Sequence, residues 1–186
     1  RGGVTTISTA GSAPGPGSAL WEAYDSERIP FRTLIVAGQG GYGRSPGATP
    51  SEKFENAQAE NTGRIINTKS VKYFADGAMF AQYMQMGEPG YIDGHHGEWL
   101  TPPEELKPQI EPFWEAGFDI NIHVNGDWGV DVTLDALADL LEEYPRPDHR
   151  YILQHFGFSR QDQATRLGRL NGVVSATGYY LWLLGD

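Results

Sequence analysis

The stretch that decides the fold is DINIHVNGDWG, residues 119–129. Apolar and polar side chains alternate along it until Gly126 ends the pattern, with Ile120, Ile122 and Val124 alternating with Asn121, His123 and Asn125. A period of two is typical of a β-strand with one face against a core. The apolar residues of 128–143 then repeat at helical spacing, so the sequence predicts a strand followed directly by a helix.

The same alternation of strand and helix extends in both directions from this unit. We expect further strands at 3–10, 31–38, 70–76, 150–156 and 172–178. Helices are expected at 18–29 after Ser18, from Thr49 to about residue 64, from Thr101 to Gly117, and after Ser159. Pro108 and Pro112 fall inside the third of these, where they predict a kink or a broken helix.

Strands joined by helical crossovers predict an α/β protein with a parallel sheet. The two usual outcomes are an open doubly wound sheet and a (β/α)8 barrel of the TIM type. The segment GQGGYG, residues 38–43, lies too far from the next helix cap to predict a nucleotide loop. Six strands do not close an eight-stranded barrel, so a barrel made by this sequence would lack a unit at each end, with about six βα units present.

Composition narrows the class of protein. The 186 residues predict one domain, 1–186, and the net charge of −10 without a basic cluster argues against nucleic acid as a partner. No apolar run reaches the about 18 residues of a membrane span. The absence of cysteine excludes thiolate metal sites. The compartment is left open, with a slight preference for the cytoplasm.

Two histidines lie near the ends of neighbouring predicted strands. His123 belongs to the strand quoted above, and His155 belongs to RYILQHF, residues 150–156. In a βα barrel the carboxyl ends of the strands carry the active site. Each histidine alone is more often a satisfied core residue, but imidazoles on adjacent strands can converge on one ion. The pair therefore suggests metal ligation.

Lys72 is the third candidate, in the strand SVKYFAD, residues 70–76. A lysine inside a buried strand is costly unless it is paired or neutral. One interpretation is a salt bridge with an acid such as Asp76. The other is carboxylation of its amine to a carbamate that bridges two metal ions, which burial favours. The spacing alone does not decide between them.

Candidates for substrate binding lie in two loops. The long loop after Lys72 contains YIDGHHGEW, residues 91–99, which could close over a substrate or form a solvated turn. Asp127 can cap the helix that follows it or contact a ligand. The methionines at 79, 84 and 86 can line a pocket or act as apolar filler. The substrate-binding candidates are His95, His96, Glu98, Trp99, Asn125 and Asp127.

Four stretches, taken together, resemble the amidohydrolase superfamily. They are VKYFADGAM (71–79), GEWLTPPEEL (97–106), WEAGFDINIHVNGDWGVDVTLDAL (114–137) and RYILQHF (150–156). The closest resemblance is to the amidohydrolase-3 branch, with its N-substituted formamide deformylase-like and exoenzyme regulatory protein AepA-like members. It implies a (β/α)8 barrel that binds one or two divalent metal ions, most often zinc. By motif, Lys72 would be the carboxylated lysine, and His123 and His155 the metal-binding histidines.

The resemblance implies a hydrolase that acts on amide or cyclic amide C–N bonds through a metal-activated water. The family's first-strand His-x-His pair and its last-strand aspartate base do not occur here. We therefore expect the sequence to be the central part of a longer enzyme, with weak metal binding and no turnover alone. Expected partners are a small-molecule substrate and the missing barrel segments, with no membrane; self-association is left open. Two alternatives stay open: a non-catalytic regulatory or ligand-binding barrel, and a metal-free glycosidase using Asp76 and Glu98.

Overall fold

The computed structural model describes residues 3–184 and divides the chain into two units. The first unit holds residues 1–72 with 116–118, and the second holds 73–115 with 119–186. The elements are β1 (Thr6–Ala10), α1 (Ala19–Asp25), β2 (Arg32–Ala37), α2 (Pro50–Gln58), β3 (Ile65–Phe74), the 3-10 turn η1 (Met79–Ala81), α3 (Pro103–Glu115), β4 (Asp119–Val124), α4 (Asp127–Glu143), β5 (Tyr151–His155), α5 (Gln161–Arg169), β6 (Val173–Ala176) and α6 (Tyr179–Leu184).

In the first unit, the strands follow the order β1–β2–β3 and pair in parallel. The caps predicted for this unit, Ser18 and Thr49, are confirmed, whereas in the second unit the helix expected after Ser159 has Arg160 as its N-cap. Ser18 accepts a hydrogen bond from the Trp21 backbone, and Thr49 and Glu52 form the capping box that starts α2 at Pro50. Phe54 packs between the rings of Tyr42 and Phe118, which gives the unit an aromatic core against α2.

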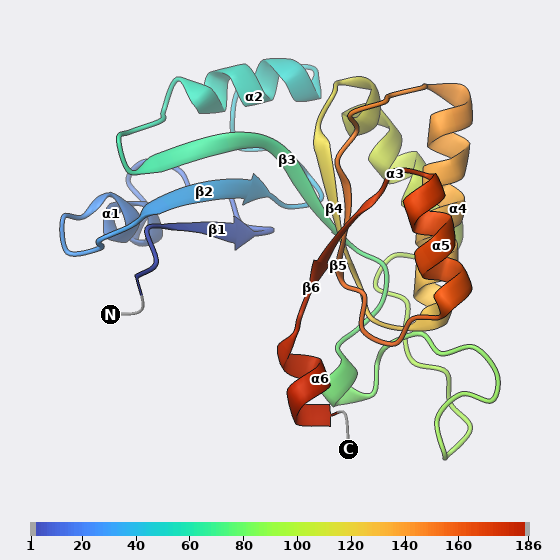
Figure 1. Cartoon of the computed structure of the whole chain (residues 1–186). Helices are drawn as coiled ribbons and strands as arrows, with labels where there is room; N and C mark the ends of the chain where they lie inside the picture. Colours follow the sequence, from blue (N-terminus) through green and yellow to red (C-terminus); the bar gives the residue numbers. More distant parts are fainter. Residues whose placement is uncertain (1–2, 185–186) are drawn as a thin grey trace. The chain divides into compact units, whose positions relative to one another are not determined.

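In the second unit, β4, β5 and β6 are parallel neighbours in that order, and α3, α4 and α5 lie along one side of them (Figure 1). The covered side of the strands carries fully buried apolar residues, which meet the apolar stripes of the helices. This core consists of Ile120, Ile122, Val124, Tyr151 and Leu153 from the strands, and Ile110, Trp114, Val130, Leu134 and Leu137 from the helices.

α3 is one helix from Pro103 to Glu115, with Pro108 and Pro112 inside it, so the prediction of a broken helix is wrong. Each proline removes one backbone donor from the helix. Leu106, Ile110 and Trp114 recur every four residues and are completely buried. Burial of that stripe outweighs the two lost hydrogen bonds, because fully burying one large apolar side chain contributes about 2 kcal/mol.

The predicted (β/α)8 TIM-type barrel is contradicted. Residues 3–184 contain six strands, where the closed barrel needs eight, and the strand orders have two ends rather than forming a ring. The broader prediction of an α/β fold with parallel strands is confirmed. The alternation that predicts each strand is local to that strand, whereas closure depends on strand number and stagger.

None of the helices in residues 3–184 combines the length and apolarity that a membrane crossing requires.

Candidate functional site

The carboxyl ends of β4, β5 and β6 all point toward the same end of the second unit (Figure 1). There the strands are followed by the α4 turn, the segment after β5 and α6, while η1 follows the end of β3. Such an end is where ligands bind in parallel α/β sheets, because the connecting loops form crevices beyond the strands. His123 is the last residue but one of β4, and His155 is the last residue of β5.

The two imidazole rings lie against each other, with their centres 4.5 Å apart and their planes at 72°. Strand register alone would not bring them together. His155 is paired with Val124, so regular alternation would direct it to the buried face that Tyr151 and Leu153 share.

The backbone breaks this alternation at the end of β5. His155 and Phe156 have φ angles of 72° and 51°, in the left-handed region that residues other than glycine seldom adopt. Each such residue costs on the order of 1–3 kcal/mol and persists only when surrounding structure holds it. Phe156 N–H donates to the Val124 carbonyl at 3.1 Å, which fixes the turn to the end of β4. Strain of this kind is found most often at functional sites.

Hydrogen bonds orient the His123 ring. The side-chain nitrogen of Asn125 donates to the Gly77 carbonyl at 3.1 Å and lies 3.0 Å from His123 Nε2. His123 Nε2 also lies 3.3 Å from the Gly77 carbonyl, so the tautomer of the ring decides whether Nε2 donates to Gly77 or accepts from Asn125. Phe74 packs against the same ring, with centres 5.4 Å apart. His123 is thereby held with its ring beside that of His155.

His155 is oriented from β6 and α6. Its Nδ1 lies 2.8 Å from the Thr177 hydroxyl, and its ring stacks on Tyr180 with 6.0 Å between centres. Thr177, Tyr180 and Phe156 help to position the histidine pair, and no sequence pattern singled them out. Nothing in their local sequence marks them, because their role arises only when the end of β6 comes beside the end of β5.

The geometry of the pair suits two ligands of one metal ion. With a zinc–nitrogen bond of about 2.1 Å and a tetrahedral angle, two imidazoles that share the ion have centres roughly 5 Å apart. Within residues 3–184, no group of three or more His, Cys, Asp or Glu side chains could hold a metal. In the described part of the chain, the pair therefore supplies at most two ligands of such a site.

Lys72 lies in β3, within the portion of the strand that belongs to the first unit. Its side chain is almost wholly buried, between buried Val71 and Tyr73. Burial lowers the pKa of Lys72 to about 7, because the charged ammonium is poorly solvated there. The structure thus places the two histidines together in the second unit, and the role of Lys72 as a metal ligand stays a prediction.

Asp76 has a structural role at the end of β3. Its carboxylate is fully buried and accepts the backbone N–H groups of Gln85, Asn125 and Gly126 at 2.7–2.9 Å. These bonds tie the long loop after β3 to the turn between β4 and α4. Both oxygens are occupied by backbone donors, so Asp76 is not available to donate a proton to a substrate.

The buried carboxyl group of Asp76 should make the stability of the protein depend on pH. Burial outweighs the backbone donors and raises the pKa of Asp76 to about 6. The folded chain then binds the proton of Asp76 more tightly than the unfolded chain does. The stabilisation that this proton provides is therefore complete below pH about 4 and is lost as pH rises through 6. We expect the free energy of unfolding to fall by up to about 3 kcal/mol over that interval. Urea titrations from pH 4 to 7 measure it, and Asp76→Asn should flatten the profile. An equally steep profile in Asp76→Asn would contradict the assignment.

The loop candidates contact other residues of the long loop and Trp128 of α4. His95 lies with Nε2 2.9 Å from the Gln82 carbonyl and Nδ1 on Asp93, and these contacts, the Gln82 carbonyl first, raise the pKa of His95. His96 Nδ1 lies 2.8 Å from the Met86 carbonyl. The rings of His96 and Trp99 both pack edge-on against Trp128.

Asp127 is the first residue of α4, and Gly126 is the N-cap, so the predicted capping role is wrong by one residue. The Asp127 carboxylate accepts the Gly87 N–H at 2.8 Å and pairs with Arg160 at 2.9 Å. Asp127, Asp131, Arg160, Glu88 and His96 line a cavity of about 200 Å³ beside the α4 start. Substrate binding by His95, His96, Glu98, Trp99, Asn125 and Asp127 stays a prediction.

Comparison with known proteins shows the fold. The chain is similar to two solved structures, uncharacterized metal-dependent hydrolases from Pyrococcus furiosus and Pyrococcus horikoshii OT3. The first has 23% identity and a TM-score of 0.64 over 90% of this chain, and the second 20% and 0.63 over 88%. The chain spans about a third of each structure's length, 32% and 31%. No protein-family model and no curated protein matches it. About nine-tenths of this chain therefore shares the fold of a segment of these two proteins.

Proposed function

We propose that the chain is part of a metal-dependent hydrolase whose metal is held by His123 and His155. The observation that carries the proposal is the pair itself, with ring centres 4.5 Å apart at the carboxyl ends of two parallel strands. The strained backbone at His155 and Phe156 supports it, because a cost of this kind is expected where function requires it. The fold similarity to two proteins described as metal-dependent hydrolases agrees with it.

The bond cleaved is proposed to be C–N, in an amide or cyclic amide. This finer assignment rests on the four stretches that resemble the amidohydrolase-3 branch. A divalent metal ion, zinc by preference, would lower the pKa of a bound water and polarise the carbonyl group. His123 and His155 would donate ring nitrogens to the ion. Asn125 and Thr177 would hold the two rings in place through the contacts described above.

Lys72 is proposed as a further ligand after carboxylation. Its burial removes water from the amine and favours the uncharged form that reacts with carbon dioxide. We expect the protein incubated with carbon-13 bicarbonate and zinc to show a carbamate carbonyl resonance that is missing from Lys72→Ala. Lys69→Ala, which removes a lysine from the same strand, is the control and should keep the signal. A protein that shows no carbamate resonance under these conditions would remove Lys72 from the site.

Two other functions are less well supported. A glycosidase with Asp76 and Glu98 as its acids is disfavoured, because both oxygens of Asp76 accept backbone N–H groups. A non-catalytic ligand-binding protein would keep the fold and the apolar surroundings of the histidines but would have no use for a metal.

The proposal is tested by metal content and hydrolysis in the intact natural protein. We expect bound zinc by elemental analysis, and release of amine from a panel of primary, secondary and cyclic amides that stops with a chelator and returns with zinc. Aryl glycosides and phosphate monoesters serve as controls and should not be cleaved. A protein that neither contains nor binds divalent metal would refute the proposal. Bound metal with hydrolysis of esters alone would refute only the C–N assignment.

A further inference from the structure

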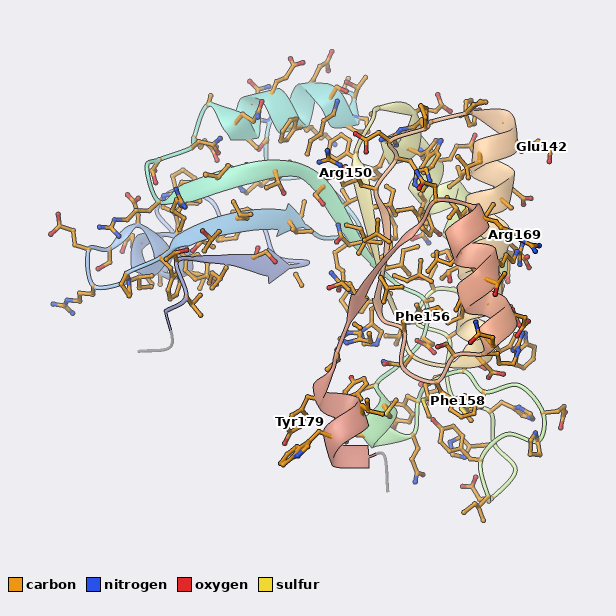
Figure 2. The ribbon with its side chains drawn as sticks, in the orientation of Figure 1. Glu142, Arg150, Phe156, Phe158, Arg169 and Tyr179 are labelled. Carbon is orange, nitrogen blue, oxygen red and sulfur yellow. The ribbon has the colours of Figure 1, made fainter. Side chains whose placement is uncertain are left out.

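The end of the second unit that carries the histidines contains a cavity of about 500 Å³. Small-molecule sites in proteins are typically of about 300–1,000 Å³, so the space suits a compound of modest size. The walls come from four segments that lie far apart in the chain: the loop after β3, the residues after β5, the end of β6, and α6. Figure 2 labels Phe156 and Phe158 after β5, and Tyr179 at the start of α6.

The walls are apolar except at one side. Met79, Met84, Phe158 and Leu181 line the cavity, and no Asp, Glu, Lys or Arg from residues 3–184 does. His155 and Thr177 supply its polar side. A carboxylate or phosphate placed among these apolar side chains would lose hydration and meet no lysine or arginine side chain, which is costly. The other cavity near this end, at the α4 start, differs in kind because Asp127, Asp131 and Arg160 line it.

Backbone strain separates this cavity from ordinary apolar packing. His155 and Phe156 both line it, and both adopt left-handed φ angles. A glycine at 156 would relieve the strain, yet the chain carries a bulky aromatic residue there. The contact of Phe80 with Tyr180, at 5.7 Å between ring centres, joins η1 to α6 across the outer side. Residues after β5 and residues of α6 therefore form the cavity wall, and His155 and Phe156 keep unfavourable backbone conformations there.

We infer that this cavity receives an uncharged aromatic or branched alkyl group of the substrate, with the bond to be cleaved next to His155. The inference rests on the proposed hydrolase function and adds the substrate class. The substrate would be a neutral amide that bears an apolar group about the size of a phenyl ring. An acidic group placed among the apolar side chains would be excluded by desolvation, because the proposed metal would lie on the His155 side of the cavity.

Binding to the metal-free protein tests the cavity separately from the chemistry. We expect phenylacetamide, followed by ligand-observed NMR and calorimetry, to bind at least about 10-fold more tightly than acetamide, because its ring enters the apolar space. Ala176→Phe, which fills the cavity from β6, should abolish this preference. Val173→Phe, on the same strand but away from the cavity, should keep it. The zinc affinity of Val173→Phe should equal that of the unmodified protein.

A second variant covers the case in which Ala176→Phe does not fold. Leu181→Glu places a carboxylate at the cavity edge on an exposed part of α6, and Ile92→Glu is its matched control on an exposed loop. Leu181→Glu should weaken phenylacetamide binding about 10-fold or more, and Ile92→Glu should not change it. Equal affinity for phenylacetamide and acetamide, or phenylacetamide binding that neither cavity variant changes, would overturn the inference. Selective binding without zinc or hydrolysis would instead uphold the cavity and refute the proposed function.

Discussion

His123→Ala should bind zinc at least about 100-fold more weakly than the unmodified protein. Loss of an outer-shell partner alone typically costs 10–100-fold in metal affinity, and loss of a direct ligand costs more. His155→Ala should have the same effect, because the two rings, 4.5 Å apart, are proposed to share one ion. The zinc affinity of the double variant should be only slightly lower than that of either single variant, because both histidines are proposed to bind the same ion. Competition against a chromophoric chelator measures these affinities.

The matched control for this pair is His96→Ala. His96 belongs to the same unit, but its Nδ1 contacts the Met86 carbonyl and its ring packs on Trp128 instead of on a second histidine. Its zinc affinity should equal that of the unmodified protein. If His96→Ala lost zinc and His123→Ala kept it, the metal site would lie in the long loop. Circular dichroism of each variant establishes that the comparison is between folded proteins.

Gly126→Ala should destabilise the protein by about 4 kcal/mol or more, which lies in the range seen only for severe core defects. A Cβ at this position would lie 2.0 Å from the Gln85 carbonyl oxygen and 2.4 Å from its carbon. Both atoms are backbone, so no side-chain rotation relieves the overlap. Gly126 N–H also donates to Asp76 at 2.7 Å, and a shift of the turn would break that bond. Chemical denaturation measures the loss.

Gly168→Ala in α5 is the control substitution. No atom lies within 4 Å of a Cβ at that position, and alanine is favoured over glycine in a helix by up to about 1 kcal/mol. The two variants make the same chemical change and should shift stability in opposite directions. If Gly126→Ala were as stable as the unmodified protein, the close packing of the long loop against the β4–α4 turn would be wrong.

The elements that local patterns encode were predictable. Alternation at 119–125 predicts β4, and the helical repeat in 128–143 predicts α4 within one residue of its observed start. Ser18 and Thr49 mark the starts of α1 and α2, because a cap bonds to backbone within its own first turn. Pro108 and Pro112 predict a kinked or broken helix, but α3 is continuous from Pro103 to Glu115. Their local cost is offset by burial of residues that local rules do not weigh.

The candidate site was predictable only in part. The spacing of His123 and His155 on neighbouring strands indicated a metal-binding pair, and the rings do lie together. Matching strand ends nevertheless do not predict how the two rings meet. Regular register directs His155 to the opposite face, and the left-handed backbone at 155 and 156 reverses this. Asp76 shows the same limit, since its donors Asn125 and Gly126 lie 49 and 50 residues away.

The sequence by itself determined the α/β pattern, the starts of α1 and α2 and the identity of the two histidines, because these follow from period, caps and side-chain chemistry within a few residues. Only the tertiary structure decided the capture of Asp76 by backbone donors and the apolar cavity beside His155. Each of these depends on segments far apart in the chain. Their contact energies arise only once the strands have paired, so no local window of sequence contains them.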